Sequence, residues 1–220
     1  MPARLSRLLL RPAARCRSRT PPFSSGPTSF RQLSQATTAA EAEADLITRL
    51  HLRVGRILAV EPHPAADKLF IETIDIGTKK ESADEQGAVA QTPEPVTIVS
   101  GLRPYYEAQE LENRDVVVAV NMKPTNFRGV RSAGMLLAAY KDDVVEVLEP
   151  PLGSSPGDLV FVAGVPKAAG GASYIKPKMF DAIKASLRTT DQCVATYKGE
   201  PLRTDRGLVS VKSLRGAPIS

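Results

Sequence analysis

The 220-residue chain is poor in the residues that build metal centres and disulfide frameworks. It holds two cysteines, two histidines and no tryptophan. Cys16 lies in an N-terminal segment that we expect to be removed, which would leave Cys193 without a partner for an internal disulfide. Because only His51 and His63 accompany that cysteine, we expect no His/Cys zinc site, no other metal and no cofactor.

Long apolar runs and catalytic signatures are missing as well. No run approaches the roughly 18 to 20 apolar residues of a transmembrane helix, so we expect no membrane partner. The segment GVRSAG lacks the first glycine of a nucleophile elbow, because Val130 stands in its place before Ser132. The sequence also lacks a glycine-rich phosphate loop followed by Lys-Ser or Lys-Thr. We therefore expect no catalytic residues, and we interpret His63 and Asp67 in HPAADKL as loop-forming residues rather than a catalytic pair.

Acidic residues are absent from the first 35 positions, which carry seven arginines and no lysine. This Arg- and Ser-rich composition is typical of a mitochondrial transit peptide. Arg4, Arg7, Arg11 and Arg15 would share one face of a helix. We predict that residues 1–35, disordered or helical, direct the chain to the mitochondrial matrix. A disordered basic tail is the alternative, and a secretory signal fits less well because Arg11 interrupts the short apolar core.

The net charge of +5 divides unevenly along the chain. The first 35 residues contribute +7 and the rest of the chain contributes −2. Within that remainder, residues 45–165 carry −6 and residues 166–220 carry +6. The last quarter is therefore the basic part of the predicted folded region, where attraction to a polyanion would be concentrated.

Alternating apolar residues predict that most of the body is β-structure. Leu50, Leu52 and Val54 alternate with polar or small residues, which predicts a half-buried strand from residue 50. Pro62 and Pro64 predict a turn directly after it. We expect further strands over 69–77, 96–101, 115–122, 134–140, 142–151 and 157–164, one helix over 105–113, and a long polar hairpin loop over 78–95. This outline is typical of a small OB-type barrel, although the pattern alone leaves a sandwich open.

Four segments resemble, in order, the tRNA-binding OB-fold domain shared by several aminoacyl-tRNA synthetases and their cofactors. They are LHLRVGRILAVEPHPAADKLFIETIDIG, VSGL, NMKPTNFRGVRSAGMLL and VEVLEPPLGSSPGD. The segment DQCVATYKGEPL resembles the C-terminal module of the endothelial monocyte-activating polypeptide II-like branch. The resemblance implies an all-β fold. A five-stranded OB-fold barrel with one short helix would occupy residues 46–164, and a small β-rich module over residues 165–220 would pack on it.

The resemblance also implies an RNA-binding surface. The predicted set is Arg53, Arg56, Asn121, Lys123, Arg128, Arg131, Ser132, Met135 and Lys198. Lys123 and Arg128 bracket the turn KPTNFRG, where they would meet phosphates. Asn121 and Ser132 would hydrogen-bond bases or a 2′-hydroxyl, and Met135 would pack on an unstacked base. Each assignment has a structural alternative: the cations could be solvated, Asn121 could cap the turn, and Met135 could belong to the core. Aromatic residues make up only 5% of the chain, so the sequence shows no obvious platform for base stacking.

These expectations combine into a non-catalytic tRNA-binding protein, either an aminoacyl-tRNA synthetase cofactor or a tRNA carrier in mitochondria. A synthetase is a further expected partner. Two alternatives stay open, a chaperone-like peptide-binding module and a structural subunit of a synthetase complex. In the family that these segments resemble, a branch of dimeric proteins described as chaperones shares the barrel. The C-terminal module resembles a built-in substitute for their second subunit, so we expect a monomer.

Overall fold

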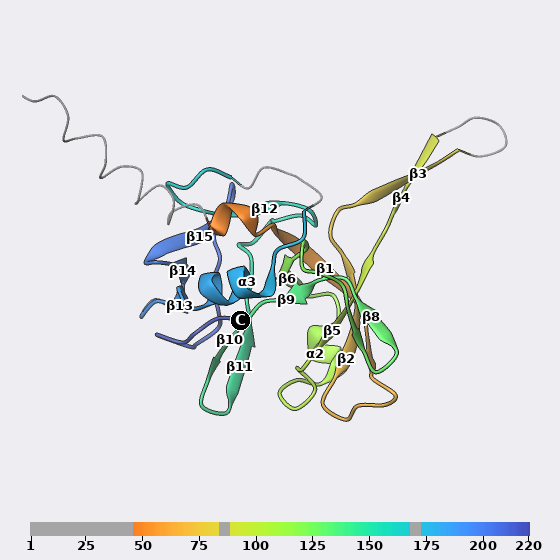
Figure 1. Cartoon of the computed structure of the whole chain (residues 1–220), viewed down its shortest axis with the longest axis horizontal. Helices are drawn as coiled ribbons and strands as arrows, with labels where there is room; N and C mark the ends of the chain where they lie inside the picture. The colour runs from red at the N-terminus through yellow and green to blue at the C-terminus, as the bar shows by residue number, and fades with distance from the viewer. Residues whose placement is uncertain (1–45, 84–88, 168–172) are drawn as a thin grey trace, which may run out of the picture.

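The computed structural model describes residues 46–83, 89–167 and 173–220 (Figure 1). The predicted presequence lies outside these residues. The elements are η1 (Ile47–Arg49), β1 (Leu52–Pro62), β2 (Phe70–Asp75), β3 (Lys79–Ala83), β4 (Val89–Pro93), β5 (Val96–Ser100), α2 (Ala108–Leu111), β6 (Asp115–Ala119), β7 (Thr125–Phe127), β8 (Val130–Ser132), β9 (Met135–Leu136), β10 (Ala138–Lys141), β11 (Val144–Val147), β12 (Leu159–Val162), α3 (Pro177–Lys184), β13 (Leu187–Thr189), β14 (Ala195–Tyr197), β15 (Glu200–Thr204) and β16 (Gly207–Leu208). Strands dominate, as predicted.

Strand β1 organises the barrel because it pairs antiparallel with β2, β6 and β12. The sheet continues from β2 to β5 and from β6 to β9. Two hydrogen bonds join the β5 side to the segment that enters β9. The Ala133 N–H donates to the Thr97 carbonyl over 2.9 Å, and the Val99 N–H donates to the Ser132 hydroxyl over 3.1 Å. The predicted all-β, OB-like fold is confirmed.

Two apolar cores lie on opposite sides of the barrel wall. The core inside the barrel includes Ile57, Ile74, Ile98, Leu111 and Val118. The second core joins Leu52, Val54 and Val117 of the barrel to Ile183, Leu187, Leu202 and Ile219 of the C-terminal part. Because neighbouring residues Val117 and Val118 belong to different cores, β6 is buried on both faces.

The C-terminal part is joined to the barrel through a continuous sheet. Strand β12 pairs with β1 on one side and with β15 on the other, and β14 and β13 follow. Helix α3 buries Phe180 and Ile183 against this part. We call residues 217–220 the closing segment because they cover the edge of β10. Its Ser220 exchanges two backbone hydrogen bonds with Ala138, and its Ile219 N–H donates to Leu187 of β13.

Several predicted elements differ from the structure. The helix expected over 105–113 is confined to the four residues of α2, and helix α3 was not predicted. Strand β1 extends to Pro62, which pairs with Phe70, so the first proline belongs to the ladder and not to the turn. The expected long loop contains the hairpin β3–β4, which projects away from the body (Figure 1). The strand expected over 134–140 is divided into β9 and β10.

The described residues contain two α-helices, of four and eight residues. Neither has the length or the apolar composition needed to cross a membrane.

Candidate nucleic-acid interface

Hairpin β7–β8 displays the cations of the predicted RNA-binding segment. Its turn is formed by Arg128 and Gly129, whose φ angles are 48° and 100°. The Asn126 side chain accepts a hydrogen bond of 2.7 Å from the Gly129 N–H and so stabilises the turn. Arg128 and Arg131 lie on the hairpin, and Lys123 lies two residues before β7. All three side chains are exposed, so the structure presents these predicted residues on one short segment.

The hairpin is fixed to the β1–β2 loop by a buried histidine. Nε2 of His63 donates to the Phe127 carbonyl over 2.9 Å, since a carbonyl can only accept. Nδ1 accepts from the Ala65 N–H over 3.0 Å. The Arg128 guanidinium also donates to the Ala65 carbonyl. The predicted loop-forming role of His63 is confirmed. The cationic turn is fixed by two contacts to the β1–β2 loop, one through His63 and one through the Arg128 side chain.

An open groove of about 500 Å³ begins at this hairpin. Three exposed aromatic side chains line it, with exposed fractions of 48% for Tyr105, 38% for Phe127 and 40% for Tyr140. The half-buried Met135, a predicted site residue, lines the same groove. Sequence reasoning missed this aromatic cluster because its members are far apart in the chain and meet only in the folded barrel. Exposed aromatic faces suit the stacking of unpaired bases.

A buried carboxyl group lies behind the wall of the groove. Ser100 lines the groove and donates its hydroxyl hydrogen to Oε1 of Glu72. Burial raises the pKa of Glu72 to about 8. Within the described residues, Oε2 of Glu72 is buried without a hydrogen-bond partner. Ser100 therefore has a fixed hydrogen-bond partner inside the barrel, while its side chain borders the groove.

Asn121 and Ser132 require a correction, because both side chains are buried and hydrogen-bonded within the protein. Ser132 is 3% exposed, accepts from the Val99 N–H and donates to the Gly134 carbonyl over 3.0 Å. Asn121 is 6% exposed and binds three backbone groups, of Arg49, His51 and Ser173. Their polar atoms are occupied, so these residues build the surface and do not present hydrogen-bonding groups to RNA.

The other predicted cations, Arg53, Arg56 and Lys198, lie outside hairpin β7–β8. Arg53 donates to the Gly157 carbonyl over 3.1 Å. Arg56 forms a two-pronged ion pair with Asp115, at 2.8 and 2.9 Å, and that carboxylate raises the pKa of Arg56. Lys198 occupies the β14–β15 turn, and Figure 1 places β14 and β8 on opposite sides of the molecule. The predicted RNA-binding residues therefore do not form one continuous surface patch in the structure.

The described residues contain no group of three His, Cys, Asp or Glu side chains that could hold a metal ion. Cys193 is a free, partly buried thiol that packs against the second core. The chemistry available at the hairpin and groove consists of cationic donors, aromatic faces and a thioether, which suits binding of a nucleic acid.

Comparisons with known proteins agree with this geometry. The domain family described as "Putative tRNA binding domain" matches residues 52–159. The aminoacyl tRNA synthase complex-interacting multifunctional protein 1 of Cricetulus griseus is 36% identical over 190 residues, which cover 86% of this chain and 49% of that protein. Cytoplasmic tyrosine–tRNA ligase of Gallus gallus is 35% identical over 199 residues, covering 88% of this chain and 35% of the ligase.

A solved structure extends the similarity to the C-terminal part. The C-terminal domain of Plasmodium vivax p43 superposes with a TM-score of 0.68 at 28% identity, and the match covers 79% of this chain and 98% of that domain. The chain spans half or less of the length of the two curated relatives, so it corresponds to a portion of each. Through residues 52–159, the chain belongs to the tRNA-binding domain family.

Proposed function

We propose that this chain is a non-catalytic tRNA-binding protein that serves an aminoacyl-tRNA synthetase in mitochondria, as a cofactor or a tRNA carrier. One observation carries the proposal. Within a tRNA-binding domain, three exposed cations on hairpin β7–β8 and the residues directly before it stand beside a groove lined by three exposed aromatic side chains. The names of the relatives support a synthetase as partner, since one is a tRNA ligase and the other interacts with a synthetase complex.

The hairpin and the groove would divide recognition between them. Lys123, Arg128 and Arg131 would neutralise backbone phosphates, which supplies affinity for any tRNA. Phe127 and its aromatic neighbours would stack on bases that are not paired in the tRNA. Such binding raises the local tRNA concentration near a synthetase and requires no bond to be made or broken.

The distribution of charge predicts strongly salt-dependent binding. Residues 45–165 carry a net −6, so attraction must come from the local cationic hairpin and from the +6 of residues 166–220. Exposed charges separated by more than about 8 Å are screened at physiological salt. Long-range steering of tRNA should therefore be weak, and contact should depend on the individual cations.

A titration of unmodified tRNA against variants at several salt concentrations tests the proposal. Lys123→Ala and Arg128→Ala should each weaken binding of all tRNAs and reduce the slope of log K against log salt by roughly 0.7 to 0.9. Lys178→Ala is the matched control, because Lys178 is an exposed cation on α3. Absence of tRNA binding by the unchanged protein would refute the proposal. Selective binding of unfolded peptides in its place would support the chaperone-like alternative.

The mitochondrial part of the proposal rests on the acid-free, arginine-rich residues 1–35. A reporter fused to residues 1–40 should enter the matrix. Replacement of Arg4, Arg7, Arg11 and Arg15 by Gln should abolish import, because the positive face is what the membrane potential acts on. A reporter that stays in the cytosol would contradict this part and leave tRNA binding unaffected.

A further inference from the structure

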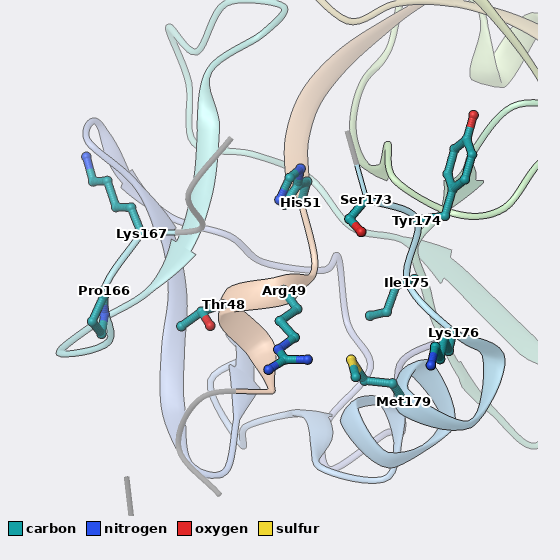
Figure 2. A pocket seen from close by; sticks show the side chains of 10 residues that line it. All are labelled: Thr48, Arg49, His51, Pro166, Lys167, Ser173, Tyr174, Ile175, Lys176 and Met179. Atoms are coloured by element: carbon teal, nitrogen blue, oxygen red, sulfur yellow. The ribbon is translucent and has the colours of Figure 1, made fainter. Parts of the chain in front are cut away.

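A second pocket, of about 590 Å³, lies where the barrel meets the C-terminal part. We call it the junction pocket. Figure 2 shows one wall made by η1 and the start of β1, and a facing wall made by the segment that leads into α3. The residues that matter for its chemistry are Arg49, His51, Ser173, Ile175, Lys176 and Met179.

The wall of the junction pocket is cationic. Arg49, Lys167 and Lys176 line it, and none of the described lining residues is Asp or Glu. Lys167 is already engaged, because its ammonium group lies 2.9 Å from Asp205 and 4.2 Å from the centre of the Phe161 ring. Among the described residues, the charged groups of Arg49 and Lys176 have no ion-pair or hydrogen-bond partner, and both side chains are exposed. These two cations, on facing walls, are available to an anion (Figure 2).

The floor of the same pocket is apolar. Ile175 is buried, Met179 is half-buried, and both line the cavity. A free inorganic anion would make no apolar contact with Ile175 and Met179. A phosphate attached to a ribose and base would use the cations and the apolar floor together.

Asn121 holds the two walls in register. Its Oδ1 accepts from the His51 N–H over 2.9 Å, and its Nδ2 donates to the carbonyls of Arg49, over 2.8 Å, and Ser173, over 3.3 Å. The Asn121 carbonyl also accepts from the Ile175 N–H over 2.9 Å. One buried amide thus connects the η1 wall to the facing wall, although their residues are far apart in the sequence.

The junction pocket lies near Lys123, the first cation of the predicted RNA-binding segment. Met122 forms a bridge with Ile175, and the next residue is the exposed Lys123. A polyanion that follows Lys123 would therefore reach the pocket within a short distance along the surface.

We propose that the junction pocket binds a phosphodiester and its adjoining nucleoside from the same tRNA, an inference that rests on the proposed function. Arg49 and Lys176 contact the phosphate, Ile175 and Met179 contact the ribose or base, and Asn121 acts as a positioning residue. Contact with tRNA then crosses from the barrel to the C-terminal part.

Substitution of the two cations tests the proposal by tRNA titration at several salt concentrations. Arg49→Gln and Lys176→Gln should each lower the affinity roughly three- to tenfold near physiological salt and reduce the salt slope by roughly 0.7 to 0.9. Lys178→Gln is the control, since Lys178 is an exposed cation of α3, two residues after Lys176, and does not line the pocket. Affinities equal to that of the control would overturn the pocket, while losses in Lys123→Ala would still support the proposed function.

Nuclear magnetic resonance provides a readout that does not depend on substitution. Titration of the whole protein with a short single-stranded RNA should shift the amide signals of His51 and Ile175. Shifts confined to the β7–β8 hairpin would overturn the pocket but leave the proposed function intact. Absence of any shift, together with absence of tRNA binding, would overturn both.

The positioning role of Asn121 has its own test. Asn121→Ala removes the side-chain hydrogen bonds to Arg49, His51 and Ser173 and leaves only backbone contacts between the walls, so adding Arg49→Gln should cause little further loss of tRNA affinity. Adding Lys123→Ala should still cause its full loss, because the hairpin does not depend on the Asn121 side chain. If Arg49→Gln costs as much in the Asn121→Ala background as in the unchanged protein, Asn121 does not position this site. Should Asn121→Ala fail to fold, the comparison of Arg49→Gln with Lys178→Gln still decides the proposal.

Discussion

Ser132 satisfies a buried backbone group where the barrel wall has no regular ladder. Its hydroxyl accepts from the Val99 N–H, so Ser132→Ala leaves that donor unpaired. We expect a loss of about 1 to 3 kcal/mol in the free energy of unfolding, measured by chemical denaturation. Thr125→Ala is the control, because Thr125 is exposed and its hydroxyl makes only a local bond to Lys123. Equal stability of the two variants would contradict this account.

Glu72 makes stability depend on pH. Burial raises its pKa from 4.5 to about 8 in the folded protein. Between these values the unfolded chain releases a proton that the folded chain retains, so rising pH lowers the free energy of unfolding. Glu72→Gln should flatten this decline across the same interval, as measured by denaturation at several pH values. The exposed Glu112→Gln should leave the decline unchanged, and an unaltered decline in Glu72→Gln would rule out Glu72 as its source.

A substitution of Phe127 distinguishes the contribution of base stacking to tRNA affinity from the contribution of charge. Its side chain is exposed, and only its backbone carbonyl is bound by His63, so Phe127→Ala should preserve the hairpin. Loss of one stacked base should weaken tRNA binding by about 1 to 3 kcal/mol without changing the salt slope. The same titration used for Lys123→Ala measures both quantities. A change in slope with no loss of affinity at high salt would show that Phe127 acts through its charged neighbours instead.

The site could be predicted only where its signal is local in sequence. The cations of KPTNFRG, Lys123 and Arg128, are close in the chain, and both are exposed, one in the hairpin turn and one directly before the hairpin. The role of Asn121 was not readable, because the carbonyls it binds lie 72 and 52 residues away. The aromatic groove was equally hidden, since Tyr105, Phe127 and Tyr140 are individually unremarkable surface residues that the fold gathers.

At the scale of elements, the closing segment, residues 217–220, contributes a buried side chain to the second core. Ile219 is fully buried between β10 and β13 and belongs to the second core. Ile219→Ala should therefore lower the free energy of unfolding by about 2 to 5 kcal/mol in chemical denaturation. Leu152→Ala provides the comparison, since Leu152 is fully exposed and its loss should change stability by less than about 0.5 kcal/mol. A small effect at Ile219 would mean that the segment is only loosely attached.

Elements were predictable where burial follows a simple period. Leu52 and Val54 mark β1 because both face the second core. Helix α3 was missed because it has only eight residues and its buried Phe180 and Ile183 give a single short repeat. The strands β3 and β4 were missed because their sequence is polar and punctuated, which we interpreted as the loop of a long hairpin. Short or polar elements depend on pairing partners that a local pattern does not reveal.

At the scale of the whole molecule, barrel and C-terminal part share a core and a sheet. A chain that ends at Gly164 would expose Leu52, Val54 and the outer edge of β12. We expect it to dimerise or aggregate, because unpaired edges and apolar faces associate, and to lose much of its tRNA affinity. Analytical ultracentrifugation and the tRNA titration measure the two effects. A soluble monomer with full affinity would show that residues 165–220 are dispensable.

The closing segment also sets an order of events during protein synthesis. Ile219 pairs with Ala139, which the ribosome adds 80 residues earlier. Until the later residues emerge, the edge of β10 lacks its partner and the second core lacks one of its walls. The nascent chain must therefore remain incompletely folded until residues 217–220 have emerged, and its exposed edges make it dependent on protection by chaperones during that interval.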